Sequence, residues 1–273
     1  KKNKKIEFYA IFVCLGIKFD KEIFKLCNKI RFLISPTTGL DHINLKDLKK
    51  MRIKLISLKN DKILKKVTST AEHTWALILG IARNITQYSN MTSKKKWLRN
   101  KFENIQLNHK KIGIIGYGRL GKMISKYAKA FGMRQFIYDK SKNIPNFTNI
   151  NKIFKLCDIV TIHIDSNLTN FNFINKKILK NSKKNQIIIN TSRGEVIDEN
   201  EVFRLLKKNH LKAAGLDVLI GDSYWGNKIP KSKHKILNSL KNKIILTPHS
   251  AGFSKEANSI TRNRIVNKFL KIK

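Results

Sequence analysis

Short apolar runs alternate with segments of helical periodicity along most of the chain. The apolar runs have the length and composition of buried strands and lie at 9–15, 32–34, 54–58, 112–115, 135–138, 159–164, 186–190, 213–218 and 244–246. Helices are predicted between them, at 21–29, around 47–48, and at 70–85, 122–131, 150–156, 176–180 and 200–208. This alternation indicates an α/β fold, in which doubly wound parallel sheets carry helices on both faces.

The predicted helix at 70–85 is amphipathic. Trp75, Leu79 and Ala82 fall on one face, and the Thr70 hydroxyl can cap the first turn. A polar, lysine-rich connection follows this helix as far as Asn104, before the next apolar run begins. The helix and its connection therefore separate the earlier group of strands from the later one.

The segment from Lys111 to Asp139 combines a strand, three spaced glycines, a helix, a second strand and a terminal acid. Its turn reads Gly116-Tyr117-Gly118-Arg119-Leu120-Gly121. Gly116 would permit the tight turn, Gly118 would let the backbone approach a pyrophosphate, and Gly121 would let the helix lie close to the strand. A glycine-rich corner in another doubly wound protein is the alternative. The complete strand–turn–helix–strand order with its acid is typical of a Rossmann dinucleotide site.

The acid at the end of the second strand bears on the choice of dinucleotide. Asp139 would accept hydrogen bonds from both hydroxyls of the adenine ribose and would repel a 2′-phosphate. The neighbouring Lys140 could tolerate that phosphate, although a solvated lysine is the commoner interpretation in so basic a chain. We therefore predict NAD as the cofactor.

The chain is strongly basic. Its 273 residues include 57 Lys and Arg against 18 Asp and Glu, which gives a formal net charge of +39. Such a charge suggests a nucleic-acid partner, but the lysines are spread from end to end without an aromatic-interleaved basic stripe. They also accompany frequent Asn and Ile, which share A/T-rich codons. We therefore predict no specific nucleic-acid partner, and a salt-dependent gel shift separates this interpretation from its alternative.

The spacing of the cysteines and the length of the apolar runs bear on where in the cell the protein is located. The three cysteines are widely separated without a C-x-x-C pair, so we predict neither a disulfide framework nor a metal site, and a reducing cytoplasmic location. The basic start before the apolar run at 8–17 superficially resembles a secretory signal, but Glu7 interrupts it and no small-residue cleavage site follows. The apolar runs are too short to cross a bilayer, which predicts no membrane partner.

Polar residues follow three of the later strands, where ligands bind in open α/β sheets. Arg193 lies in a Thr-Ser-Arg-Gly turn and could bind a carboxylate or polarise a ketone. Asp217 and Asp222 follow the next strand, and His249 follows the last one and could exchange a proton. A surface arginine and a structural histidine are the alternatives, but their shared position at strand ends favours a functional site.

The chain resembles the D-isomer-specific 2-hydroxyacid dehydrogenase family, and within it the phosphoglycerate dehydrogenase-like branch. The resemblance covers nearly the whole chain and rests on the order and spacing of several motifs. These are Ser35-Pro36-Thr37-Thr38-Gly39-Leu40-Asp41-His42-Ile43, Ala71-Glu72-His73-Thr74-Trp75-Ala76-Leu77, Gly113 to Gly121, Asn190-Thr191-Ser192-Arg193-Gly194, Ala214-Gly215-Leu216-Asp217-Val218 and Thr247-Pro248-His249.

The resemblance implies a role for each candidate. Arg193 would bind the substrate carboxylate and 2-oxo oxygen, and His249 would donate or accept the hydroxyl proton. Asp222 stands where the family usually has a Glu that pairs with the histidine, and Asp is one methylene shorter. Further contacts are implied to the substrate from Thr37, Thr38 and Gly39, and to the cofactor from His163, Thr191, Ser192 and Asp217.

Together these observations predict an NAD-dependent oxidoreductase that interconverts a D-2-hydroxy acid, such as a 3-phosphoglycerate-like acid, and its 2-oxo acid. Residues 71–250 would form a Rossmann-type NAD-binding domain, inserted in a smaller flavodoxin-like substrate domain made of 1–70 and 251–273. The family pattern implies that this smaller domain is incomplete at its N-terminus. It also implies a homodimer. The alternative function is a catalytically impaired, NAD-binding dimerising or regulatory relative.

Overall fold

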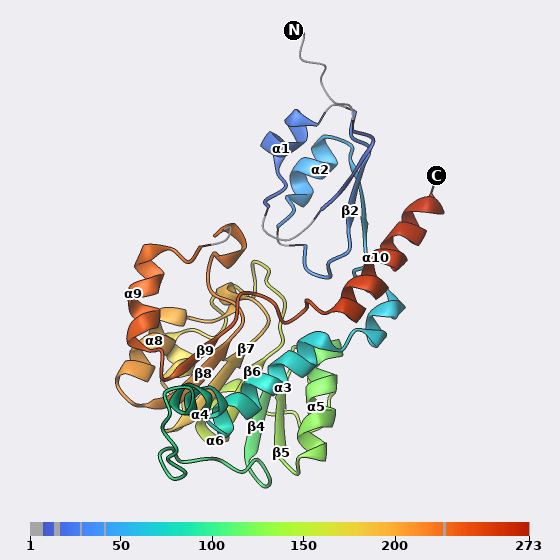
Figure 1. Ribbon diagram of the computed structural model, residues 1–273. Coiled ribbons are helices and arrows are strands. Elements are labelled where there is room, and N and C mark those ends of the chain that lie inside the picture. The colour runs from blue at the N-terminus through green and yellow to red at the C-terminus, as the bar shows by residue number, and fades with distance from the viewer. Residues whose placement is uncertain (1–7, 14–16, 28, 41, 226–227, 273) are drawn as a thin grey trace. The chain divides into compact units, whose positions relative to one another are not determined.

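The computed structural model describes residues 8–13, 17–27, 29–40, 42–225 and 228–272 (Figure 1). Asp41 of the first motif and the end of the first predicted strand lie outside these residues. The chain divides into two compact units. The first comprises residues 1–67, 221–228 and 253–273, and the second comprises 68–220 and 229–252. Residues 221–228, expected in the larger domain, group with the smaller unit; the chain leaves the second unit at Gly221, whose φ is +80°.

A parallel sheet of six strands forms the centre of the second unit, in the order β5-β4-β6-β7-β8-β9. The strands are β4 (Lys111–Ile115), β5 (Arg134–Tyr138), β6 (Ile159–Ile162), β7 (Gln186–Asn190), β8 (Leu211–Leu216) and β9 (Ile244–Leu246). The strand order reverses between β4 and β6, and the carboxyl ends on either side of such a reversal are where ligands bind. The predicted α/β class with parallel sheets is confirmed.

Helices cover both faces of this sheet. They are α3 (Ser69–Ala82), α4 (Ile85–Thr92), α5 (Arg119–Ala130), α6 (Ile150–Leu156), α7 (Lys176–Leu179), α8 (Glu199–Lys207) and α9 (Lys231–Ser239), with a 3-10 turn η2 (Gly194–Val196). Side chains of β4 show the two layers, because successive residues point to opposite faces. Ile112 and Ile114 pack with α3 and α5, which lie side by side in Figure 1. A Cβ on Gly113 would instead meet Ile153 of α6.

The start of α3 differs from the sequence prediction. The helix begins at Ser69 with Thr68 at the N-cap, so Thr70 lies inside the first turn and is not the capping residue. The Thr68 hydroxyl instead donates to the Glu72 carboxylate at 2.5 Å. At the other end the helix stops at Ala82, and Asn84, with φ +50°, introduces the separate helix α4.

The first unit contains a three-stranded parallel sheet in the order β1-β2-β3. Its elements are β1 (Ala10–Phe12), α1 (Lys21–Leu26), β2 (Phe32–Ser35), α2 (Leu45–Lys50), β3 (Lys54–Ser57), the 3-10 turns η1 (Lys62–Lys66) and η3 (Asp222–Tyr224), and α10 (Lys255–Leu270). Phe24 and Leu33 lie in one apolar cluster of this unit, and Ile265 of α10 packs in another with Ile34 and Ile56. The Asp61 carboxylate also holds α10, through Arg264 Nε at 3.0 Å.

Among the helices of the described residues, none combines the length and the apolar character that crossing a membrane requires.

Candidate active site

The glycine turn follows β4 and leads into α5. Gly116 has φ +95°, and a Cβ there would lie 2.5 Å from the carbonyl oxygen of His163, so only glycine fits. A Cβ on Gly121 would lie 2.0 Å from the carbonyl oxygen of Gly116, which shows how closely the helix approaches the turn. Gly118 differs, because its Cβ would meet nothing within 4 Å. The turn is thus closely packed at Gly116 and Gly121 and open at Gly118, the position assigned to the pyrophosphate.

Basic and aromatic side chains surround the first turn of α5. Arg119 is its first residue and is half-buried, and burial lowers the pKa of its guanidinium. Lys122 Nζ lies 5.8 Å from the centroid of the Tyr117 ring, within the range of a cation–π interaction. These cations and the N-terminal N–H groups of the helix suit a pyrophosphate, which carries negative charge. The residues present therefore fit the predicted dinucleotide.

Asp139 is tied to the same turn from the end of β5. Its Oδ2 accepts the Tyr117 N–H at 2.6 Å, and its Oδ1 accepts the Ser141 N–H at 3.0 Å. Each oxygen of an ionised carboxylate can accept more than one hydrogen bond, so the ribose role proposed for Asp139 remains compatible with this geometry. Beside it, Lys140 Nζ donates to Thr169 Oγ1 at 3.1 Å.

His163 contributes its main chain to the turn. Its carbonyl oxygen leaves no room for a side chain at Gly116, and its N–H donates to Ile115 O at 2.7 Å. The side chain turns back to the sheet, where Nε2 lies 2.9 Å from Thr161 Oγ1. Burial lowers the pKa of His163 to about 3. The ring is therefore neutral at physiological pH and does not act as a cation for the phosphates.

Arg193 lies in a turn that Asn190 organises at the end of β7. Asn190 Oδ1 accepts the Ser192 N–H at 3.0 Å and the Ser192 hydroxyl at 2.8 Å, while its Nδ2 donates to Arg193 O at 2.9 Å. Arg193 Nη1 donates to Ser192 O at 2.7 Å. The next residue, Gly194, has no room for a side chain, because a Cβ there would lie 2.1 Å from the Leu219 main chain.

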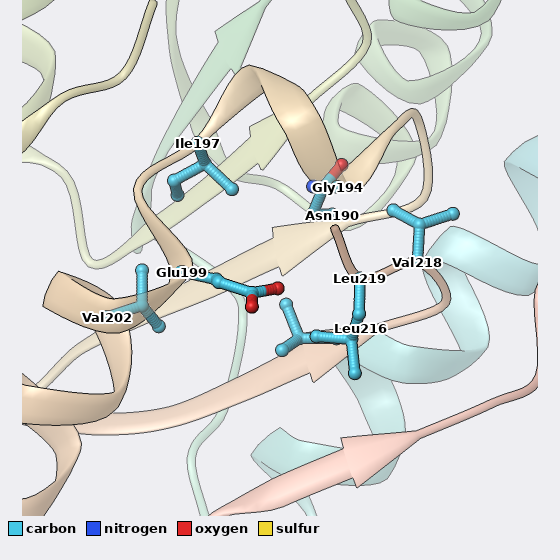
Figure 2. A pocket seen from close by; sticks show the side chains of 8 residues that line it. All are labelled: Asn190, Gly194, Ile197, Glu199, Val202, Leu216, Val218 and Leu219. Atoms are coloured by element: carbon cyan, nitrogen blue, oxygen red, sulfur yellow. The ribbon is translucent and has the colours of Figure 1, made fainter. Parts of the chain in front are cut away.

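A small cavity lies beneath this turn. Its volume is about 10 Å³, enough for one water molecule at most. Figure 2 shows its lining side chains, from Asn190, Gly194, Ile197, Glu199, Val202, Leu216, Val218 and Leu219. The Glu199 carboxylate accepts the Ile220 N–H at 2.9 Å and pairs with Lys233. This cavity is too small to hold the acid substrate predicted from the sequence.

The loop that carries His249 is fixed by Asp217, which is 1% exposed. Asp217 Oδ1 accepts the Thr247 hydroxyl at 2.5 Å and the Ser250 N–H at 2.9 Å, and Oδ2 accepts the Ala251 N–H at 2.9 Å. The Asp217 carbonyl oxygen accepts the His249 N–H at 2.8 Å. Asp217 therefore shapes the histidine loop, and the cofactor contact that the resemblance implies for it stays a prediction.

The other two candidate groups belong to the first unit. Thr37 follows β2, and its hydroxyl donates to Gly39 O at 2.8 Å and lies 2.7 Å from Ser35 Oγ, which closes the Thr37-Thr38-Gly39 turn. Asp222 opens the 3-10 turn η3, and its Oδ1 accepts the Ser223 hydroxyl at 3.3 Å. Of the predicted residues, Arg193 and His249 follow β7 and β9 of the second unit, two strands of one sheet that β8 separates.

Two functional candidates of α3 escaped the sequence interpretation, which used them only as part of a motif. Thr74 Oγ1 lies 2.7 Å from Thr191 Oγ1, next to the arginine turn, and His73 Nε2 lies 2.9 Å from Thr247 Oγ1. A signal was present in the sequence, since three consecutive polar residues, Glu72, His73 and Thr74, come directly before the apolar part of the helix. Their partners are far away in the chain, so the signal did not identify them.

Comparison with known proteins identifies the same regions. The family model described as D-isomer specific 2-hydroxyacid dehydrogenase, NAD binding domain, matches residues 75–251. The glyoxylate reductase of Thermococcus litoralis is 28% identical over 265 residues, which cover 92% of this chain and 76% of that protein. The D-3-phosphoglycerate dehydrogenase of Methanocaldococcus jannaschii is 29% identical over 265 residues, which cover 94% of this chain but 48% of that protein.

A solved structure gives a whole-chain likeness. The D-lactate dehydrogenase from Aquifex aeolicus, complexed with NAD and lactic acid, superposes with a TM-score of 0.85 at 25% identity, over 99% of this chain and 85% of the other. The family model describes an NAD-binding domain and covers the glycine turn, Asp139, Arg193 and His249. The prediction of NAD as the cofactor is confirmed.

Proposed function

This chain belongs to the D-isomer-specific 2-hydroxyacid dehydrogenase family, and from this premise we propose that it interconverts a D-2-hydroxy acid and its 2-oxo acid. The observation that carries the proposal is the pair of braced loops after β7 and β9, which hold Arg193 and His249 in the unit that also contains the glycine turn. The family acts on CH–OH donors with NAD, so the chain is an oxidoreductase.

The residues divide the chemistry between them. Arg193, a permanent cation with several N–H donors, binds the carboxylate and polarises the 2-oxo oxygen. His249 donates a proton to that oxygen during reduction and removes it during oxidation. Bound NAD supplies or accepts the hydride. We assign the cradling of the acid to the N–H groups of Thr37-Thr38-Gly39, and the pairing with the His249 ring to Asp222.

We favour a phosphorylated acid similar to 3-phosphoglycerate as the substrate. The excess of cations attracts a multiply charged anion more strongly than a singly charged one. The relatives carry the names of enzymes for three acids, namely glyoxylate reductase, D-3-phosphoglycerate dehydrogenase and D-lactate dehydrogenase. A panel of glyoxylate, pyruvate and 3-phosphohydroxypyruvate therefore discriminates among the choices.

The test follows NADH absorbance with this panel, in the wild type and in Arg193→Ala, Arg193→Lys and His249→Ala. We expect Arg193→Ala to lose most activity, and Arg193→Lys to recover little, because an ammonium cannot bind a carboxylate through two parallel N–H groups. His249→Ala should lower kcat with little change in NADH affinity. Turnover that survives both alanine substitutions contradicts the site. NADH binding without turnover of any acid supports the regulatory alternative instead.

We also propose a homodimer and a cytoplasmic location. The segment after α3 exposes large apolar side chains, with Ile85 54%, Trp97 78% and Leu98 51% exposed, as expected of an interface that a second copy covers. Sedimentation of Trp97→Glu beside the wild type tests the dimer, and a monomeric wild type refutes it. For the location, the wild-type protein fractionated from its own cells should appear with the cytoplasmic proteins, and its recovery in another fraction contradicts the assignment.

A further inference from the structure

Adjacent side chains of α3 reach the ends of three strands. His73 Nε2 lies 2.9 Å from Thr247 Oγ1, after β9, and 3.5 Å from Asp217 Oδ1, after β8. Thr74 Oγ1 lies 2.7 Å from Thr191 Oγ1, after β7. This single helix therefore contacts both the loop that carries His249 and the turn that carries Arg193.

The number of protons available fixes which groups donate and which accept in the hydrogen bonds among His73, Thr247 and Asp217. The Thr247 hydroxyl has one proton, which it donates to Asp217 Oδ1 at 2.5 Å. The Thr247 oxygen can therefore only accept from His73, so His73 carries its proton on Nε2. The chain of donors runs from His73 through Thr247 to a carboxylate that is 1% exposed, and a hydrogen bond to an ionised, buried acceptor is stronger than one between neutral groups.

Helix α3, which carries His73, packs closely against β8 and β9. A Cβ on Gly215 of β8 would lie 3.1 Å from Leu77 Cβ, and a Cβ on Gly80 of α3 would lie 3.2 Å from Ile245 Cδ1 of β9. Glycine at both positions thus permits close contact between α3 and the two strands. A side chain held by so closely packed a helix loses little further entropy when it forms a hydrogen bond.

His249 needs such support because its backbone is strained. Its φ is +52°, in the left-handed region, which is unfavourable for a non-glycine residue and persists only where the surroundings hold it. The Asp217 carboxylate supplies that hold, since it accepts the N–H groups of Ser250 and Ala251 just after the histidine. His73 in turn holds Thr247, two residues before the histidine.

We propose that His73 is a positioning residue: through Thr247 and Asp217 it keeps His249 in the backbone conformation from which the proton is exchanged. His73 acts on the loop and not on the acid or the cofactor. The inference rests on the proposed function for its kinetic consequence, but the network itself can be measured without turnover.

The kinetic test compares His73→Ala, His73→Gln and Thr247→Val, with His234→Gln as a control, because His234 is an exposed histidine of α9. We expect His73→Ala to lower kcat by about tenfold or more, since small misplacements of a catalytic group cost up to about a hundredfold. KM and the Kd of NADH should stay within about twofold. His73→Gln should restore most of kcat, because its amide can donate to Thr247.

The double variant His73→Ala/Thr247→Val should be no slower than Thr247→Val alone, because both changes break one chain of hydrogen bonds. The second readout is hydrogen–deuterium exchange, in which His73→Ala should speed exchange of the Ser250 and Ala251 amides. Unchanged kcat, a loss confined to KM or NADH binding, or additive effects would overturn the proposal, and so would unchanged exchange. If the wild type turns over no acid, the proposed function fails, and exchange alone decides whether His73 holds the loop.

Discussion

A single methyl group at Gly118 should separate cofactor binding from folding. Gly118 is the N-cap residue of α5 with φ −72°, a value that alanine adopts freely, and its Cβ would meet nothing within 4 Å. Alanine is a poorer N-cap than glycine by up to about 1 kcal/mol, but it stabilises by about 0.4–1 kcal/mol because it restricts the unfolded chain. The two effects oppose each other, so the free energy of unfolding of Gly118→Ala should change by less than about 1 kcal/mol.

Cofactor binding should respond far more strongly. The open face of Gly118 is where the backbone would approach the pyrophosphate, and a methyl group there would push the phosphates away. Forcing an extra methylene into a packed contact costs about 1–3 kcal/mol, which corresponds to roughly 5- to 150-fold weaker binding. The matched variant is Gly121→Ala, whose Cβ would lie 2.0 Å from the backbone oxygen of Gly116. This variant should be destabilised by about 1–3 kcal/mol or more, because a backbone atom cannot easily move aside.

The assay combines urea unfolding of the cofactor-free protein with a fluorescence titration of NADH, for the wild type and both variants. Gly118→Ala should keep the unfolding midpoint and lose affinity, whereas Gly121→Ala should unfold at lower urea. Wild-type affinity in Gly118→Ala would refute the assignment of its open face to the pyrophosphate. A stability loss in Gly118→Ala equal to that of Gly121→Ala would refute the steric argument itself.

Three further variants test charged groups. Asp139→Asn should reduce the ratio of NAD to NADP affinity, because it removes the charge that repels a 2′-phosphate; an unchanged ratio contradicts the ribose role. Hydrogen bonds from the Ile63 N–H and the Arg264 side chain lower the pKa of the Asp61 carboxyl. Ionised Asp61 therefore stabilises the fold at pH above about 4, which is near the pKa of Asp in an unfolded chain. This stabilisation is lost as the pH falls through the lowered pKa of the folded protein. Thermal melts of Asp61→Asn should therefore converge with the wild type in acid, and a constant difference contradicts this. Glu199→Ala leaves the Lys233 ammonium, only 24% exposed, without its partner, which should cost about 3 kcal/mol; a loss below about 1 kcal/mol in urea unfolding refutes the pairing.

The strands of the second unit were predictable because burial on both faces leaves a continuous apolar run. Every residue of β6 and of β7 is buried, and both strands appear in the sequence as short runs rich in β-branched residues. The helices α4, α9 and α10 were not predicted. Only Ala257 and Ile265 are buried in the 16 residues of α10, and only Leu237 is buried in α9. So few buried positions leave no clear helical periodicity among abundant polar residues.

The cofactor turn and the histidine loop also differ in how far the sequence alone predicts them. The cofactor turn and its acid lie between Lys111 and Asp139, so strand, glycines, helix and acid appear together in one stretch of sequence. The histidine loop depends on contacts across the chain, since His73 and Thr247 are 174 positions apart. Tertiary pairing of this kind has no local spacing and could not be deduced from composition or periodicity.

This difference bears on why the substrate is harder to deduce than the cofactor. The glycine turn is supported by Asp139 and by the main chain of His163, whereas Asp217 supports the histidine loop. The supports are separate groups, so a substitution near Arg193 or His249 can alter the acid that is accepted while the cofactor turn is preserved. Recognition of NAD therefore carries no information about the acid, and the substrate panel is the measurement on which the assignment depends.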